Sequence, residues 1–273
     1  MTEPILEVKN LCFSYDEGQE ILKNINTVIY PGEKIAVIGN NGAGKSTFFL
    51  NMNGVRIPSS GDIMCKGMKI TKKNRNDLRL TVGIVFQEAD MQLIAPTVRD
   101  EISFGPLNMK LDMDEVVRRT DNAIHQMNLE KYEKQPPHYL SGGEKKRVTI
   151  GGVLSMDTPV LIFDEPTASL DPANTKLFEE TALKLSESGK TILISTHDID
   201  FAYRFADRVL VFSDGEIIAD GKIDDVLKRE DIIKKANLRK PVVLEMYEFL
   251  VANKKIDRKA HIPKSIEELK ELL

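Results

Sequence analysis

The sequence predicts a three-layer α/β protein, in which a largely parallel sheet lies between helices and a helical tail follows. Short apolar runs that end in polar residues recur along the chain, the clearest being 35–38, 160–163 and 191–195. Segments with helical periodicity separate these runs, as in a parallel sheet that is covered on both faces. The chain has 273 residues, 41% hydrophobic and 29% charged, which suffices for one large domain with an appendage.

The elements can be placed in order from their periodicity and turn residues. The N-terminal part is expected to contain a strand over 5–13, a turn at 16–18, a strand over 35–38, a helix over 44–51 and a strand over 82–86. From 97 to 155 the pattern is mostly helical, with breaks expected at Gly105-Pro106 and Pro136-Pro137, because proline disrupts a helix. The later elements are strands over 160–163, 191–195 and 208–212 and helices over 171–188 and 198–205.

This order predicts an α/β core over 1–235, interrupted by a helical insert at about 97–155. The remaining residues, 236–273, are expected to form a C-terminal helical extension. Its first half suggests one amphipathic helix. A second helix is expected where Ser265 stands three residues before Glu268, which is the spacing of a capping box.

The segment Gly39–Thr47 (GNNGAGKST) matches the pattern G-x-x-x-x-G-K-[ST] between a predicted strand and a predicted helix, the context of a phosphate-binding loop. Its glycines let backbone N–H groups turn toward the β- and γ-phosphates of ATP. Lys45 would reach the terminal phosphates, the Ser46 hydroxyl would bind Mg²⁺, and Thr47 would contact the α-phosphate side. A glycine-rich turn without chemical use is the alternative, and the flanking strand and helix argue against it. The residues predicted to bind ATP in this loop are Gly39, Asn40, Asn41, Gly42, Ala43, Gly44, Lys45, Ser46 and Thr47.

Two carboxylates follow the apolar run 160–163. Asp164 is expected at the carboxyl edge of the sheet, where α/β proteins bind ligands, and is predicted to hold a magnesium-bound water. A buried structural aspartate is the alternative. Because adjacent strand-end residues diverge, Glu165 is predicted to face the γ-phosphate and to activate or position the attacking water.

The segment Ser141-Gly142-Gly143 precedes a predicted helix and resembles a second anion-binding site. It offers a serine cap, bare backbone N–H groups and the positive end of a helix. One chain does not need two such sites for one triphosphate. We therefore expect a head-to-tail pair, in which Ser141, Gly142 and Gly143 of one protomer cover the γ-phosphate that Lys45 of the other holds. A role for Ser141 as a helix cap alone is the alternative.

With these motifs the chain resembles the ATPase subunits of ABC (ATP-binding cassette) transporters, whose signature is matched by Leu140–Glu144. The resemblance covers about 1–235. It implies a P-loop NTPase (RecA-like) three-layer core with an antiparallel β edge and a helical subdomain that carries the signature. It also implies that the chain binds and hydrolyses Mg-ATP at a composite dimer interface.

The resemblance assigns roles to three further residues. His197, in the stretch Ser195–Asp198, matches the switch histidine that contacts the γ-phosphate and steadies the attacking water. Gln87 matches the Q-loop glutamine, whose amide approaches Mg²⁺ or the water. Tyr15 matches the aromatic residue that stacks on adenine. A structural histidine, a polar strand cap and a surface tyrosine are the respective alternatives.

The stretches 91–98 and 100–106 are similar to those of the ATPases of energy-coupling-factor importers, which take up vitamins or transition metals such as cobalt and nickel. At 88–90 the chain departs from many members of this branch, which carry a proline. The resemblance implies uptake of a transition metal ion, with cobalt favoured, or of a vitamin. The partners implied are a second ATPase protomer, identical or paralogous, an integral membrane coupling subunit that docks near 91–98, and a substrate-binding membrane subunit.

Composition and length exclude several other classes of function. No stretch approaches the roughly 20 apolar residues that span a bilayer, and the acidic start predicts no secretion signal. Together with the membrane partners that the resemblance implies, this predicts a peripheral position on the cytoplasmic face of the cell membrane. The net charge of -4 without a lysine-rich block argues against nucleic-acid binding. Non-transport alternatives are a DNA-maintenance ATPase, which would need a longer insert before Ser141, and a regulatory scaffold, against which Glu165 and His197 argue.

Overall fold

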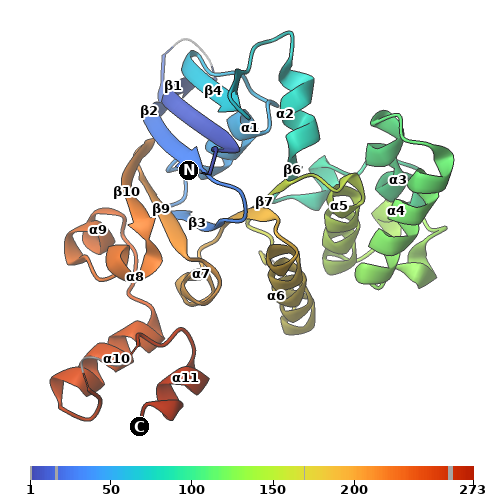
Figure 1. The fold of residues 1–273 in the computed structure, drawn as a ribbon. Coiled ribbons are helices and arrows are strands. Elements are labelled where there is room, and N and C mark those ends of the chain that lie inside the picture. Colours follow the sequence, from blue (N-terminus) through green and yellow to red (C-terminus); the bar gives the residue numbers. More distant parts are fainter. Residues whose placement is uncertain (1, 16–17, 169, 258–260) are drawn as a thin grey trace.

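A six-stranded sheet forms the centre of the protein in this computed structural model, which describes residues 2–15, 18–168, 170–257 and 261–273 (Figure 1). In spatial order its strands are β10 (Glu216–Lys222), β9 (Arg208–Ser213), β3 (Lys34–Gly39), β8 (Thr191–Ser195), β7 (Val160–Asp164) and β6 (Val82–Val85). All neighbours are parallel except β10, which runs antiparallel to β9. The apolar runs of the sequence therefore form the predicted parallel sheet.

The two faces of this sheet belong to two different apolar cores. On β3, Ile35 and Val37 pack into one core, and Ala36 and Ile38 into the other, because successive side chains of a strand point to opposite faces. The first core includes α1 (Lys45–Met52) and the second includes α6 (Pro172–Glu187) and α7 (Ile199–Phe205). Figure 1 shows α6 and α7 together on one side of the sheet. This confirms the three-layer arrangement.

A second, four-stranded antiparallel sheet covers α1 from the outside. Its strands, in spatial order, are β2 (Glu20–Ile29), β1 (Leu6–Ser14), β4 (Ser60–Cys65) and β5 (Met68–Lys69). Apolar side chains of β1 and β2, such as Leu6 and Leu22, share a core with Phe48 of α1. The antiparallel β edge is thus confirmed. The turn predicted at 16–18 includes Asp16 and Glu17, which lie outside the described residues.

The helical insert consists of α3 (Val98–Asn108), α4 (Met113–Gln126) and α5 (Gly142–Met156), which Figure 1 shows together at one side of the central sheet. A short helix, α2 (Arg75–Thr81), precedes β6. The break expected at Pro136-Pro137 is confirmed, because that region holds only the 3₁₀ turns η2 (Glu130–Tyr132) and η3 (Pro137–Tyr139). These turns connect α4 to α5 and bring the start of α5 back toward the core.

The break expected at Gly105-Pro106 is wrong, because α3 continues through Pro106 to Asn108. A proline inside a helix removes the N–H group that would bond the carbonyl four residues earlier. Here the deprived carbonyl belongs to Ile102, and the Ser155 hydroxyl of α5 donates to it at 2.6 Å. A tertiary hydrogen bond therefore replaces the missing helical one.

Replacing Ser155 with alanine should lower the free energy of unfolding by about 1–3 kcal/mol, because the buried Ile102 carbonyl then lacks a donor. Urea unfolding followed by circular dichroism measures the change. Ser103→Ala is the matched control, since the Ser103 hydroxyl also bonds a carbonyl of α3 but at an exposed site. Equal stability of the two variants would contradict this account of how α3 accommodates Pro106.

The chain ends in α8 (Ile223–Val226), α9 (Glu230–Lys235), α10 (Val242–Ala252) and α11 (Ile266–Glu271). The cap predicted for α11 is present in part, with the Ser265 hydroxyl accepting from the Glu268 N–H at 3.1 Å. The Glu268 carboxylate accepts from the Lys264 N–H at 2.8 Å instead of from the Ser265 N–H, so the reciprocal bond of a capping box is not made. Helices α10 and α11 form a small apolar core of their own, whereas Leu244 of α10 joins the main core. The domain division at 235 stays a prediction. Within the part of the chain that the structure describes, no helix has the length and apolar character of a membrane span.

Candidate nucleotide-binding site

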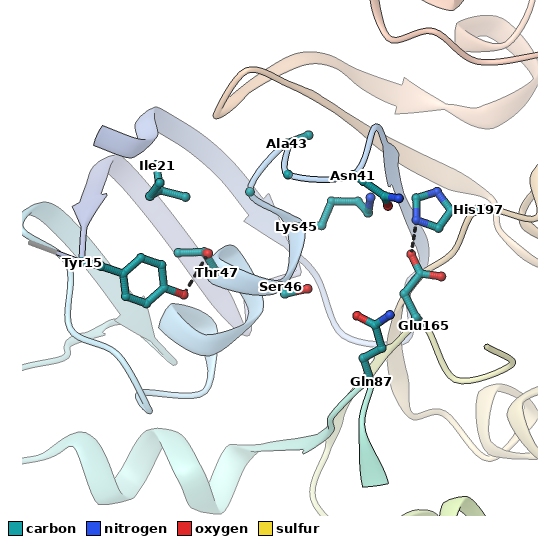
Figure 2. Close-up of a pocket in the computed structure, with 12 residues that line it drawn as sticks. Tyr15, Ile21, Asn41, Ala43, Lys45, Ser46, Thr47, Gln87, Glu165 and His197 are labelled. Atoms are coloured by element: carbon teal, nitrogen blue, oxygen red, sulfur yellow. Dashed lines mark hydrogen bonds and ion pairs between the residues drawn. The ribbon is translucent and has the colours of Figure 1, made fainter. Parts of the chain in front are cut away.

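A cleft of about 300 Å³ opens at the carboxyl edge of the central sheet (Figure 2). It brings together the predicted residues 41–47 of the phosphate loop with Tyr15, Gln87, Glu165 and His197. Five segments that are far apart in the sequence thus face one cavity. Ile21 also lines it and was not predicted.

The phosphate loop connects β3 to α1 through backbone that only glycine adopts readily. Gly39, Gly42 and Gly44 have φ angles of 143°, 78° and 103°. A Cβ atom on Gly39 would also lie 2.2 Å from the backbone oxygen of Phe212. No acidic residue occupies the first turn of α1, so its free N–H groups and positive end remain available to an anion. The loop therefore has the geometry of a polyphosphate cradle.

Lys45 is held in the loop by two backbone carbonyls. Its ammonium donates to Gly39 O at 2.7 Å and to Asn40 O at 3.1 Å, so these two predicted residues contact Lys45 although neither lines the cleft. Burial lowers the pKa of Lys45, and the charges of Glu165 and Asp164 oppose this shift. An ammonium has three donors, so the third can bond a phosphate oxygen without breaking the first two.

The two predicted carboxylates diverge because of the backbone at Glu165 and a hydroxyl on the neighbouring strand. Glu165 has a φ of 45°, a left-handed conformation that costs about 1–2 kcal/mol for a residue with a Cβ. Ser195 lies opposite Asp164 in the β7–β8 register. Its hydroxyl donates to Asp164 Oδ1 at 2.5 Å and accepts from the Glu165 N–H at 2.9 Å. Ser195 thus fixes both acidic residues.

Glu165 and His197 face each other across the end of the cleft (Figure 2). Glu165 Oε1 lies 2.9 Å from His197 Nε2, and only 8% of Glu165 is exposed. Burial raises the pKa of Glu165, His197 and Lys45 lower it, and the charge of Asp164 raises it again. A carboxylate with a raised pKa is a better acceptor for a proton of water than an ordinary glutamate.

Tyr15 lies at the opposite end of the cleft from Glu165 (Figure 2). Its hydroxyl is 3.1 Å from Thr47 Oγ1, its ring packs edge-on against Phe13, and about half of its surface is exposed. An exposed ring at this end suits stacking on a base, while the phosphates would extend along the loop toward Glu165. Gln87 follows β6 and lines the cleft with an exposed side chain.

The residues predicted to bind Mg²⁺ are all oxygen donors, as this hard cation requires: the Ser46 hydroxyl, the Gln87 amide and the Asp164 carboxylate. Ser46 and Gln87 line the cleft, and Asp164 lies buried behind it. Since Ser195 donates to Asp164 Oδ1, the Oδ2 atom can accept from a metal-bound water. The donor set therefore fits Mg²⁺ that is shared with phosphates and water.

Ser141, Gly142 and Gly143 do not line this cleft, and instead they begin α5. The Ser141 hydroxyl donates to Glu144 Oε2 at 2.8 Å and forms a capping box with Glu144. The Tyr132 hydroxyl, which also bonds Glu144, holds the pKa of that carboxyl below its usual range. The capping role of Ser141 is thus present in the single chain, while its role toward the ATP of a second protomer stays a prediction.

The sequence-based reasoning missed two polar residues that organise the site, Ser195 and Lys146. Ser195 ends the strand beside β7, so the same strand-end argument that identified Asp164 could have identified it. Lys146 lies buried in α5 and donates to the backbone carbonyl of Gln87. No short sequence motif predicts this contact.

Comparisons with known proteins agree with this geometry. The family model described as ABC transporter matches residues 22–168, which include the phosphate loop and both carboxylates. The energy-coupling factor transporter ATP-binding protein EcfA of Methanocaldococcus jannaschii is 45% identical over 253 residues, covering 92% of this chain and 90% of that protein. A putative ABC transporter ATP-binding protein of Methanosarcina acetivorans is 47% identical over 249 residues, covering 90% of this chain and 76% of that protein.

Two solved structures show the same architecture. CbiO1 from Clostridium perfringens, part of the ABC transporter complex cbiONQ, superposes with a TM-score of 0.74 at 42% identity, covering 90% of this chain and 99% of that chain. The dimeric post-hydrolysis state of the ATP-binding cassette MJ0796, bound to ADP and Pi, superposes with a TM-score of 0.73 at 29% identity. The match covers 80% of this chain and 98% of that chain. The chain therefore belongs to the ABC transporter family, as an ATP-binding subunit that hydrolyses ATP with Mg²⁺, and it resembles the ATPases of energy-coupling-factor transporters.

Proposed function

We propose that this chain is the ATPase of an energy-coupling-factor importer, and that ATP closes a head-to-tail pair of such ATPases to drive uptake. The observation that carries the proposal is the separation of two anion-binding segments in one chain. The phosphate loop lines the cleft, while Ser141–Gly143 lie outside it at the start of α5. Each segment completes a site only when a second protomer, identical or paralogous, supplies the other.

In the proposed reaction, a water attacks the γ-phosphorus, the bond to the leaving oxygen of ADP breaks, and Glu165 accepts the proton of the water. His197 orients the water and contacts the γ-phosphate, and Lys45 holds the terminal phosphates. The Ser46 hydroxyl and the Gln87 amide would hold Mg²⁺, and Asp164 would hold a water bound to it; the metal would neutralise charge on the phosphates. Tyr15 stacks on adenine at the far end of the cleft.

A groove between β6 and the helical insert is the proposed docking site for the membrane coupling subunit. It has a volume of about 260 Å³, and its largely apolar lining includes Phe104, Val153 and Ile94, the last of which is 71% exposed. The loop at its rim is held firmly, because Glu101 accepts from the N–H groups of Ile94 and Ala95 at 2.8 and 2.7 Å. A fixed, exposed apolar loop beside a groove suits a partner helix.

This docking site would hold the chain on the cytoplasmic face of the membrane as a peripheral subunit. The transported substrate, a transition metal ion with cobalt favoured or a vitamin, would meet the membrane subunits and not this chain. The resemblance to CbiO1, part of the cbiONQ complex, supports this assembly. The DNA-maintenance and scaffold alternatives gain no support from EcfA, CbiO1 or MJ0796.

Introducing charge at the groove tests the proposal. The double variant Met91→Glu/Ile94→Glu should lose co-purification with the membrane subunits and at least about tenfold of the transport rate, because two buried charges would oppose docking. ATP affinity of the purified chain should stay within about twofold of the wild type. Met113→Glu, on an exposed apolar side chain of α4 away from the groove, is the control. Loss of ATP binding would show that the loop belongs to the core, and intact transport would refute the docking site.

A further inference from the structure

A buried lysine connects α5, the signature helix, whose first residues belong to the signature Leu140–Glu144, to residues 86–90, the Gln87 segment. Lys146 lies in the second turn of α5, and only 3% of it is exposed. Its ammonium donates to Phe86 O at 2.8 Å and to Gln87 O at 2.6 Å. A buried ammonium is costly unless partners compensate it, and these two carbonyls do so. The contact therefore fixes the backbone at Gln87 to α5.

Two further interactions act on the same connection. The preceding residue, Lys145, pairs with Asp90 at 2.7 Å, so α5 contacts both ends of the segment 86–90. Burial lowers the pKa of Lys146 to about 8, and the negative charges of Asp164 and Glu165 at the end of β7 oppose this shift. Lys146 thus belongs to the signature helix, bonds the backbone of the Gln87 segment and lies within the electrostatic reach of the two carboxylates at the end of β7. The Lys145–Asp90 pair is more exposed than the contacts of Lys146, so we expect it to contribute less to holding the Gln87 segment on the signature helix.

We propose that Lys146 is a positioning residue that makes the Gln87 segment and the start of α5 move as one unit. The inference rests on the proposed composite site, where Gln87 meets the ATP of its own chain and Ser141–Gly143 meet the ATP of the partner. A displacement of α5 by the partner's γ-phosphate would then be passed to Gln87 through two hydrogen bonds. The two ATP sites of a pair would consequently respond to each other.

Lys146→Met removes the two hydrogen bonds and keeps the length of the side chain. In the purified full-length chain, the affinity for a fluorescent ATP analogue without Mg²⁺ should stay within about twofold of the wild type. The kcat for Mg-ATP should fall at least about tenfold, and the Hill coefficient of hydrolysis should fall from above one to about one. Lys146→Arg, which can still donate to both carbonyls, should restore at least about half of the kcat.

Lys145→Met is the matched control and should change kcat less than about twofold, because its pair with Asp90 is partly exposed. The inference is overturned if Lys146→Met keeps the wild-type kcat and Hill coefficient, or if the wild type itself shows a Hill coefficient of one. A variant that melts at a lower Tm and is not rescued by arginine would show a structural role only and would also overturn it. If Glu165→Gln with Lys146 intact never dimerises in Mg-ATP, the composite site fails, and the inference fails with it.

Discussion

Replacement of Glu165 by glutamine should lower the kcat for ATP hydrolysis by about 10²–10⁴-fold, the range that a positioned general base contributes. Glutamine keeps the shape of the side chain but cannot accept the proton of the attacking water. Because the phosphate loop is untouched, ATP affinity should stay within about twofold of the wild type. Steady-state phosphate release and equilibrium binding of ATP measure the two quantities. Glu187→Gln, at the exposed end of α6, is the control.

The same variant should accumulate as an ATP-bound dimer, because the γ-phosphate that would bridge the two protomers of the proposed pair is no longer removed. Gel filtration with Mg-ATP should show this dimer, and ADP should not support it. In the wild type, kcat should fall on the acid side through a pKa above that of an ordinary glutamate, because burial raises the pKa of Glu165 and only its ionised form accepts a proton. A persistent monomer in Mg-ATP would contradict the composite site.

Lys45→Ala should abolish ATP binding under ordinary assay conditions, with a loss of affinity of about 100-fold or more. Removing a charged donor to phosphate costs about 1.5–3 kcal/mol for each hydrogen bond that is lost. The carbonyls of Gly39 and Asn40, which now accept from Lys45, would also face the phosphates without a cation between them. Fluorescence titration with an ATP analogue measures the affinity.

Lys34→Ala provides the control for the Lys45 variant, since Lys34 begins β3, the strand that leads into the phosphate loop, and pairs with the exposed Asp207. Its ATP affinity should be unchanged. Circular dichroism of both variants distinguishes a lost contact from a lost fold. Undiminished affinity in Lys45→Ala would refute the assignment of the phosphate loop.

The parallel strands and the phosphate loop were predictable because local rules govern them. An apolar run that ends in a glycine-rich turn leaves few conformations for Gly39–Thr47, and the carboxyl ends of parallel strands meet at one edge. Asp164, Glu165 and His197 therefore had to lie at the same edge of the sheet as the phosphate loop, and their nearness to Lys45 follows from the strand order β3-β8-β7. The antiparallel sheet was predicted only through the family resemblance, because the sequences of β2 and β4 carry no distinctive motif.

Other features depend on contacts between distant segments and could not be predicted locally. The helix through Pro106 survives because of Ser155, which lies 53 residues away from the carbonyl that it bonds. Lys146 meets the Phe86 carbonyl across 60 residues of sequence. Sequence periodicity marks a position as buried but does not say which backbone group a buried polar side chain will find.

The capping box at the start of α5 has a consequence for nucleotide discrimination. A serine hydroxyl carries a single proton, and in the isolated chain Ser141 gives it to Glu144. In the proposed pair, an incoming γ-phosphate must compete with this carboxylate for the proton, and the nearby negative charge opposes its approach. ADP lacks the γ-phosphate and therefore has no oxygen at this position to accept the Ser141 proton in place of Glu144. Breaking the hydrogen bond between Ser141 and Glu144 would thus disfavour dimer formation unless a γ-phosphate takes the place of the carboxylate, which only ATP can supply. Separation of the protomers after hydrolysis would restore the bond within each chain.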